Sequence, residues 1–420
     1  MTGLLILVVY VALFFGAAFL LTLIRRRLGQ LRDFTSLKTV TFGDESAVVP
    51  DRVASVLSLV VVFLVWGAFT GSKLVPIHVP GPYTGTTSFT YTAETPDGST
   101  GQGTVTVTVH ASDAVAEPPE PGPATGIVTS DSATVAAWRS VLISAQRNDG
   151  TDARIVSVAG QAIAPGESVS VPHGQVVMTA KGSLNFSPDK GLQMEPIWMP
   201  SPEAVVGQFI DIAQNGYQNI PLLEHVGWSL WRVIAGFLLG SIVGIPLGYA
   251  MGLSGWARGW FDPIVEFMRP VPPLALIPLV IIWFGIGEEG KIVLLFLAAL
   301  WVMIIAARAG VSGVNITKVH AAFSLGASKW QVLRYVIVPN SLPEIFTGAR
   351  VAMGVCWGTV VAAELVAAEK GAGKMIVAAS KFQSTDIVMM GIIIIGVIGF
   401  AIDILMRKAE GHLVPWKGRS

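Results

Sequence analysis

The sequence predicts an all-α transmembrane bundle of about seven spans, into which a β-sandwich domain is inserted. Hydrophobic residues make up 52% of the chain and charged residues only 13%, whereas a typical soluble domain carries about 25% charged residues. Several apolar runs reach the length of about 20 residues that a helix needs to cross a bilayer. Residues 77–197 contain no such run, and parts of them alternate apolar with polar residues, as half-buried strands do.

The composition also argues against several classes of function. The formal net charge is zero, which gives no support to nucleic-acid binding. The one cysteine, Cys356, lies in a predicted span, so an intrachain disulfide is impossible. We recognise neither a metal-ligand cluster nor a nucleophile with its general base, and therefore expect no cofactor and no enzymatic activity. The six histidines are scattered, at positions 78, 110, 173, 225, 320 and 412.

The N-terminal apolar run covers residues 3–24 and is followed at once by Arg25, Arg26 and Arg27. A secretory signal peptide carries its positive charge before the apolar run, so residues 1–27 are predicted to form a transmembrane anchor instead. Since Lys and Arg favour the cytoplasmic side, the N-terminus is placed outside. Residues 28–53 then form a cytoplasmic link, and a second span at 54–76 returns to the outer side.

Residues 77–197 are predicted to form an extracytoplasmic β domain. Val105, Val107 and Val109 alternate with threonines, and Pro96-Asp97-Gly98 supplies a turn before them. The pieces resemble bacterial immunoglobulin-like or cadherin-like repeats with their two halves in swapped order. No Asp-rich run is present, so we expect no calcium site. Further strand candidates are 154–158, 168–171, 175–180 and 183–187, and residues 134–146 fit either a helix or a strand.

The third span is predicted to pack closely against a second helix. Residues 198–226 are expected to be an amphipathic segment at the outer surface, and the remaining transmembrane domain covers 227–406. This third span carries glycines at four-residue intervals along one helical face, which in a membrane allows close approach of a neighbour; lining a pathway is the alternative. These glycines are Gly236, Gly240, Gly244, Gly248 and Gly252.

Prolines interrupt the fourth span, at about 271–286. Pro270, Pro272, Pro273 and Pro278 fall within nine residues, and helices rarely tolerate this density. Irregular backbone inside a membrane persists only where protein buries it or where it lines a cavity. The span is therefore predicted to be short or discontinuous, which indicates a gate or a pathway and makes Pro272 and Pro273 candidates for lining it.

Two segments approach a phosphate-binding loop without meeting its requirements. Residues 285–291 read G-x-x-x-x-G-K, but Ile292 stands where Ser or Thr must bind magnesium. Residues 371–374 read G-A-G-K and are shorter still. Both are expected at the outer ends of spans, so this chain is not expected to hydrolyse ATP.

The last spans are expected at about 291–308, 343–366 and 387–406, followed by a basic, cytoplasmic tail at 407–420. Residues 316–340, between the fifth and sixth spans, are polar and carry Lys318, Lys329 and Arg334. This stretch is predicted to form two short cytoplasmic helices that break at Gly326 and end at Pro339.

The pattern within 316–340 resembles the EAA loop of ABC importer permeases, which reads E-A-A, three residues, G, nine residues, I-x-L-P. His320 stands in place of the glutamate, and Val336 and Val338 in place of the isoleucine and the leucine. The resemblance implies that a cleft on a cytoplasmic ABC ATPase closes over these small residues. The missing glutamate puts in doubt any salt bridge that it makes in other members. The residues implied in coupling are His320, Ala321, Ala322, Gly326, Ala327, Val336 and Pro339.

From about residue 197 to 420 the chain resembles permeases of the taurine, aliphatic sulfonate and nitrate branch of ABC importers. The matching segments are Pro200-Ser201-Pro202, 228–232 (WSLWR), 274–279 (LALIPL), 283–287 (WFGIG), Ala363-Glu364 and 385–388 (TDIV). Residues 362–366 (AAELV) and 413–418 (LVPWKG) are most similar to taurine permeases. Such permeases usually have six spans, the first directly before Pro-Ser-Pro, so the leading anchor and the β insertion are departures.

This resemblance implies a type I ABC importer permease fold in the bacterial inner membrane, with the N-terminus periplasmic and the C-terminus cytoplasmic. It also implies four kinds of partner: a second copy of the chain, a dimer of cytoplasmic ATPases that binds ATP and magnesium, a periplasmic solute-binding protein and the lipid membrane. Uptake of taurine is the expected function, with another aliphatic sulfonate or nitrate as the alternative.

Glu364 is an ionisable residue within a predicted span, which makes it a candidate functional residue. It either pairs with Arg232 on another helix or joins Arg232 and Trp357 in contacting an anionic or zwitterionic solute. A different class of function also stays open, a membrane-anchored adhesion or scaffold protein in which the β domain binds a partner. The coupling stretch and the proline-broken span favour the permease, because a scaffold needs neither.

Overall fold

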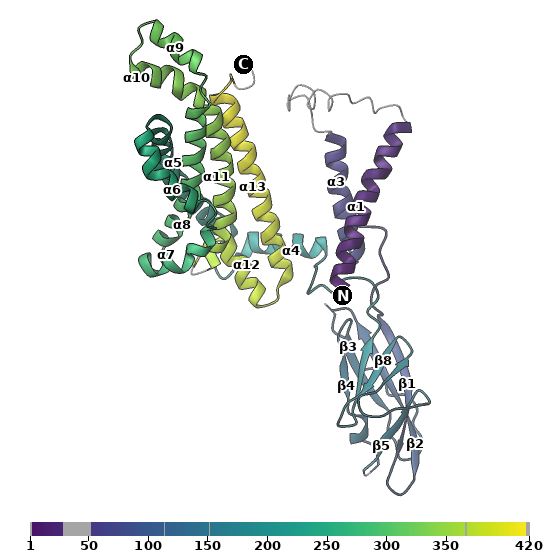
Figure 1. Cartoon of the computed structure of the whole chain (residues 1–420). Coiled ribbons are helices and arrows are strands. Elements are labelled where there is room, and N and C mark those ends of the chain that lie inside the picture. The colour runs from purple at the N-terminus through teal and green to yellow at the C-terminus, as the bar shows by residue number, and fades with distance from the viewer. Residues whose placement is uncertain (1, 28–51, 113, 151, 366–367, 417–420) are drawn as a thin grey trace. The chain divides into compact units, whose positions relative to one another are not determined.

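The computed structural model describes residues 2–27, 52–112, 114–150, 152–365 and 368–416 (Figure 1). The chain divides into two compact units, Met1–Glu203 and Ala204–Ser420, which we describe separately. The predicted cytoplasmic link at 28–53 falls almost entirely outside the described residues.

The N-terminal unit begins with two helices, α1 (Thr2–Arg27) and α3 (Arg52–Thr70), which pack against each other. Helix α3 ends six residues before the predicted limit of the second span at residue 76. The reason is Gly71, whose φ of +65° a right-handed helix does not accommodate.

The rest of this unit is built from two sheets. In the five-stranded sheet the order is β3-β2-β1-β5-β6, and in the four-stranded sheet it is β4-β9-β8-β7. All pairings are antiparallel except that of β2 with β3. The strands are β1 (Gly85–Glu94), β2 (Thr100–His110), β3 (Asp131–Ala136), β4 (Val141–Ile143), β5 (Arg154–Val158), β6 (Gln161–Ala162), β7 (Ser168–Val171), β8 (Gly174–Met178) and β9 (Leu184–Pro188).

One cluster of buried side chains joins the two sheets. Val105 and Val107 of β2 are fully buried, as the alternation with threonine predicted, and Phe186 of β9 enters the same cluster from the other sheet. The rings of Phe89 and Phe186 stack with their centroids 5.9 Å apart. Burying a side chain of this size contributes about 1.5–3 kcal/mol, so the shared cluster is what holds the sheets face to face.

The ambiguous segment at 134–146 resolves into the end of β3, the short β4 and a 3-10 turn, η2 (Ala145–Arg147). Strands β5 and β7 have the predicted limits. The turn predicted at 96–98 is present, with φ of +80° at Gly98.

The second unit is helical, and its elements begin with most of α4 (Pro202–Asn215). The predicted amphipathic segment at 198–226 is interrupted, because Gly216 has φ of +76° and Pro221 precedes α5. The further elements are α5 (Leu222–Leu253), α6 (Gly255–Met268), η3 (Pro273–Leu276), α7 (Ile277–Phe284), α8 (Glu288–Ser312), α9 (Ile316–Ser324), α10 (Lys329–Val332), the π-helical turn η4 (Leu333–Ile337), α11 (Val338–Leu365), α12 (Ala372–Lys381) and α13 (Thr385–Leu413).

Among the described residues, five helical segments are long and apolar enough to cross a membrane, and six if one bent pair is counted as a span. The seventh predicted span corresponds to α1 (Thr2–Arg27), which enters this count only as the shorter apolar helix Val11–Ile24, so that span stays a prediction. The bent pair is α6 with η3 and α7, whose axes differ by 92°. The break falls at 269–272, where the prolines predicted a discontinuous span.

The glycine stripe of α5 packs against α8, as predicted. A Cβ at Gly236 would lie 2.4 Å from that of Leu295, and one at Gly240 would lie 2.6 Å from that of Ala299. At Gly248 it would lie 2.5 Å from the carbonyl oxygen of Ile304. The two helices therefore approach as closely as glycine permits.

Gly248→Leu is expected to separate α5 from α8 and to lower the free energy of unfolding by about 3 kcal/mol, since a side chain forced into packed backbone typically costs 1–3 kcal/mol. The matched control is Gly227→Leu, also in α5, because nothing lies within 4 Å of a Cβ at that position. Thermal unfolding of the two purified variants in nanodiscs measures the difference. Equal midpoints for both variants would contradict the close packing.

Candidate functional site

The stretch between α8 and α11 forms a helical hairpin at one end of the second unit (Figure 1). The Asn315 side chain caps α9 by accepting a hydrogen bond from the backbone N–H of Thr317, at 2.8 Å. Ser328 and Gln331 form a reciprocal capping box at the start of α10. Between the two helices, Gly326 has φ of +83° and open space around it, so glycine is required there for backbone conformation, as predicted.

The expectation that Pro339 ends the second helix is wrong. Helix α10, the π-helical turn η4 and α11 run on as one helical segment, Lys329–Leu365, and Pro339 lies in the first turn of α11. The wider π turn directly before it gives the proline ring room that a regular α turn lacks. The carbonyl oxygen of Pro339 accepts a hydrogen bond from the indole N–H of Trp416, at 3.2 Å, which places the C-terminal segment beside the hairpin.

The hairpin leaves its predicted coupling residues accessible to different degrees. His320, Ala321 and Gly326 are exposed, and the others, Ala322, Ala327, Val336 and Pro339, are half-buried. Their role in coupling stays a prediction.

The motif did not single out the large apolar side chains around the glycine turn of the hairpin that are exposed to solvent. These are Phe323, Leu325 and Trp330, which are 46%, 89% and 67% exposed. Their signal in the sequence is large apolar residues in an otherwise polar stretch.

A second site lies among α5, α8 and α11, where Arg232 is 1% and Glu364 0% exposed. Arg232 Nη1 donates to Glu364 Oε1 at 2.7 Å and to the carbonyl oxygen of Lys370 at 2.8 Å. Its Nε and Nη2 donate to the two carboxylate oxygens of Glu288, at 2.5 and 2.8 Å. Lys291 Nζ also donates to Glu288, at 2.8 Å. We call these four side chains the ion cluster; two cations balance two carboxylates.

The glycine-rich turn before α12 wraps around the carboxylate of Glu364. The backbone N–H of Gly373 donates to Glu364 Oε2 at 2.8 Å, and Ser229 Oγ donates to Oε1 at 2.7 Å. Ser229 Oγ in turn accepts from the N–H of Ala372, at 2.9 Å. A Cβ at Gly371 would lie 2.4 Å from Glu364 Oε2, so only glycine leaves room for the carboxylate.

His225 supports the same turn from α5. His225 Nδ1 lies 3.1 Å from both the backbone nitrogen and the carbonyl oxygen of Gly371. Nε2 faces the carbonyl oxygen of Tyr217 at 3.4 Å. The imidazole therefore bridges the turn before α12 and the segment that precedes α5.

The two segments whose sequences partly match a phosphate-binding loop both contribute residues to this site. Glu288 and Lys291 lie within 285–291, and Gly371 and Gly373 lie within 371–374. None of these four residues was predicted from the sequence to contribute to a site, and neither was Ser229. A signal was present in Glu288 and Lys291, two opposite charges three residues apart at the start of an apolar run.

Of the two alternatives for Glu364, the structure contains the interhelical pair with Arg232. Buried charges require such partners, and four hydrogen bonds already occupy the Arg232 guanidinium. The other candidate pathway residues, Trp357, Pro272 and Pro273, are not part of the ion cluster. Trp357 donates its indole N–H to the carbonyl oxygen of Ile395 on α13, at 3.0 Å, while Pro272 and Pro273 lie at the start of η3. Contact of these residues with a solute stays a prediction.

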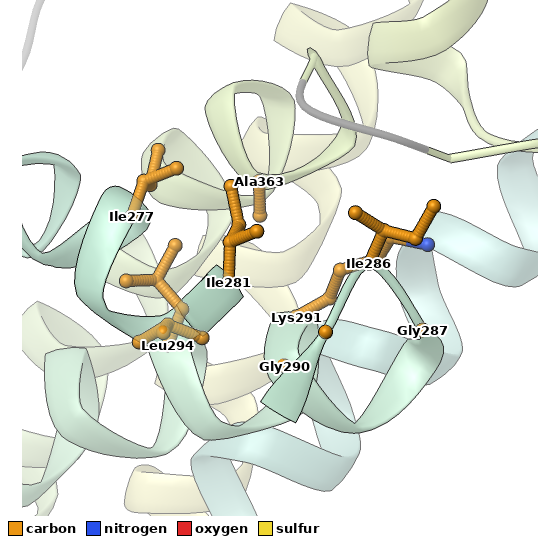
Figure 2. Close-up of a pocket in the computed structure, with 10 residues that line it drawn as sticks. Ile277, Ile281, Ile286, Gly287, Gly290, Lys291, Leu294 and Ala363 are labelled. Carbon is orange, nitrogen blue, oxygen red and sulfur yellow. The ribbon is translucent and has the colours of Figure 1, made fainter. Parts of the chain in front are cut away.

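A small cavity adjoins the ion cluster (Figure 2). Ile277 and Ile281 of α7, Lys291 and Leu294 of α8 and Ala363 of α11 line it. Its lining is mostly apolar, and Lys291 is the member of the ion cluster that borders it.

Comparison with known proteins places the helical unit in a family. Residues 221–413 match the family described as binding-protein-dependent transport system inner membrane component. The chain is 45% identical to the taurine transport system permease protein TauC of Escherichia coli, over 54% of this chain and 82% of that protein. It is 37% identical to the putative aliphatic sulfonates transport permease protein SsuC of Escherichia coli, over 52% of this chain and 81% of that protein.

A third relative is the nitrate import permease protein NrtB of Synechococcus elongatus, which is 31% identical over 53% of this chain and 76% of that protein. Three permeases with different named solutes thus align with about half of this chain and with most of their own lengths. Together with apolar helices long enough to cross a membrane, these similarities show that the chain belongs to the family of inner-membrane components of binding-protein-dependent transport systems, the permease subunits of ABC importers.

Proposed function

We propose that this permease serves the uptake of taurine. The observation that carries the proposal is the 45% identity to TauC across 82% of that protein. Transport of another aliphatic sulfonate or of nitrate is the alternative, which the similarity to SsuC and NrtB supports.

The proposed complex contains two copies of this chain, a dimer of cytoplasmic ATPases that binds ATP and magnesium, and a periplasmic solute-binding protein. The hairpin at 316–340 is proposed to dock into the ATPase, because it leaves Phe323, Leu325 and Trp330 exposed beside a glycine turn. With His320 at the glutamate position of the EAA pattern, docking relies on shape and apolar contact. We propose that the N-terminus and the β domain lie in the periplasm and the C-terminus in the cytoplasm.

Reconstitution tests the proposal directly. The chain is placed in liposomes with its own ATPase and solute-binding protein, and ATP-dependent uptake of labelled taurine is measured. We expect competition by taurine analogues and little competition by nitrate or longer alkanesulfonates. Strong competition by the latter solutes would move the function to another sulfonate or to nitrate. Absence of any uptake in the presence of an active ATPase would overturn the proposal.

A further inference from the structure

Four large apolar side chains are exposed where the β domain meets α3. Leu74 and Ile77, which follow α3, are 60% and 77% exposed, and Leu192 and Trp198, which follow β9, are 65% and 75% exposed. We call these four residues the junction collar. Loops of a folded domain seldom gather such residues at one place unless the surface has a partner.

Backbone hydrogen bonds bring the two segments of the collar together. The N–H of Leu192 donates to the carbonyl oxygen of Pro80 at 2.7 Å, and the N–H of Tyr83 donates to that of Asp189 at 2.9 Å. A Cβ at Gly191 would lie 2.2 Å from the carbonyl oxygen of Gly81, so the two segments pass each other with no space for a side chain there. The two segments that carry the collar residues therefore meet at one junction, although more than 100 residues separate them in sequence.

The same junction is tied to the end of α3. The N–H of Met194 donates to the carbonyl oxygen of Phe69 at 2.8 Å, and that of Val79 to the carbonyl oxygen of Ala68 at 3.2 Å. The indole N–H of Trp66 donates to the carbonyl oxygen of Pro200 at 2.9 Å. These hydrogen bonds to three residues in the last turns of α3 restrict bending between the helix and the β domain.

Helix α3 is long and apolar enough to span a membrane over Val53–Thr70. Leu74 follows its end by four residues, a reach of at most about 14 Å of extended chain. The collar must therefore lie near the level at which α3 leaves the hydrocarbon. Trp198 suits this level, because indole rings concentrate in the headgroup region. Lys73 and Lys190 are exposed in the same two segments and are suited to lipid phosphates.

We propose that the junction collar inserts into the headgroup region of the bilayer that α3 crosses, and so seats the β domain on the membrane surface. The partner is lipid, because the collar is continuous with a membrane helix and combines apolar side chains with flanking lysines. The far end of the domain has the opposite character. The turn between β1 and β2 carries Thr95, Asp97 and Gly98, and the ten residues of β1 place it about 33 Å from Gly85.

Site-directed spin labelling of the full chain in liposomes tests this proposal. Cys356→Ser removes the one native cysteine, and Ile77→Cys, Leu192→Cys and Trp198→Cys then each receive a label. Collisions of each label with oxygen, which partitions into lipid, are compared with collisions with a water-soluble nickel chelate. Control labels are Val156→Cys, an exposed apolar position on β5, and Asp97→Cys at the far turn.

We expect the ratio of oxygen to nickel collisions to be severalfold higher at the three collar positions than at both controls. Nickel collisions at the collar as frequent as those at Asp97 would show a water-exposed junction and overturn the proposal. Shielding from both reagents would mean that protein covers the collar, either the helical unit or a second copy, and would also overturn it. Trypsin resistance of each labelled β domain, matched to that of the unlabelled chain, verifies the fold.

Discussion

Arg232→Met is expected to lower the free energy of unfolding by about 3–5 kcal/mol, the cost of removing one partner from a buried ion pair. The change leaves Glu364, which is 0% exposed, without the cation that neutralises it. Thermal unfolding of the purified chain in nanodiscs measures this loss. The control is Arg407→Met, which breaks an exposed pair with Asp403 one helical turn away and should cost only about 0.3–0.5 kcal/mol.

A double variant separates the two roles that Arg232 and Glu364 can have. If the pair is structural, Arg232→Met combined with Glu364→Leu should recover much of the lost stability, since two buried charges often exchange for apolar residues without net cost. ATP-driven uptake should then recover in the double variant together with its free energy of unfolding. Recovered stability with uptake still lost would instead show that the two charges contact the solute. A loss below about 1 kcal/mol in the single variant would contradict the closed ion cluster.

Leu325→Asp is expected to reduce ATP-driven uptake at least tenfold while leaving the free energy of unfolding nearly unchanged. Leu325 is 89% exposed beside the glycine turn of the hairpin, so its loss removes no internal packing. If it is an anchor in the proposed ATPase cleft, truncation typically costs 2 kcal/mol or more of binding free energy, roughly a 30-fold change in affinity. Co-purification with the ATPase and uptake into liposomes measure the two effects.

Leu142→Asp is the matched control for this prediction. Leu142 is also exposed, at 60%, and it lies on β4, outside the residues that match the permease family. The control should retain both co-purification and uptake. Uptake at the level of the unaltered chain for Leu325→Asp would show that the tip of the hairpin does not carry the coupling.

Local pattern was sufficient for many elements of this protein. The limits of β5 and β7 followed from a two-residue period, because alternation fixes which side chains can reach a core. The left-handed turn at Gly326 and the break before Pro273 followed from residues whose backbone preferences hold in any surroundings. The glycine stripe of α5 predicted close packing correctly, although its partner α8 was not named.

Pro339 shows where a local rule failed. Proline usually ends a helix, but the π turn at Leu333–Ile337 supplies the space that its ring needs, and the helix continues to Leu365. Nothing in the five residues of that turn identifies it in advance. Whether the turn takes up an extra residue depends on how the whole helix packs.

The sequence by itself determined the membrane class, the β insertion and the resemblance to importer permeases, because these depend on composition, period and motif. Only the tertiary structure decided how the buried charges are paired. Glu288 and Glu364 lie 56 and 132 residues from Arg232, and their contact depends on which faces of three apolar helices meet. Hydropathy does not distinguish those faces, since lipid and protein both accept apolar side chains. The segments that resembled phosphate loops gained a role as parts of an ion cluster only once α5, α8 and α11 were in place.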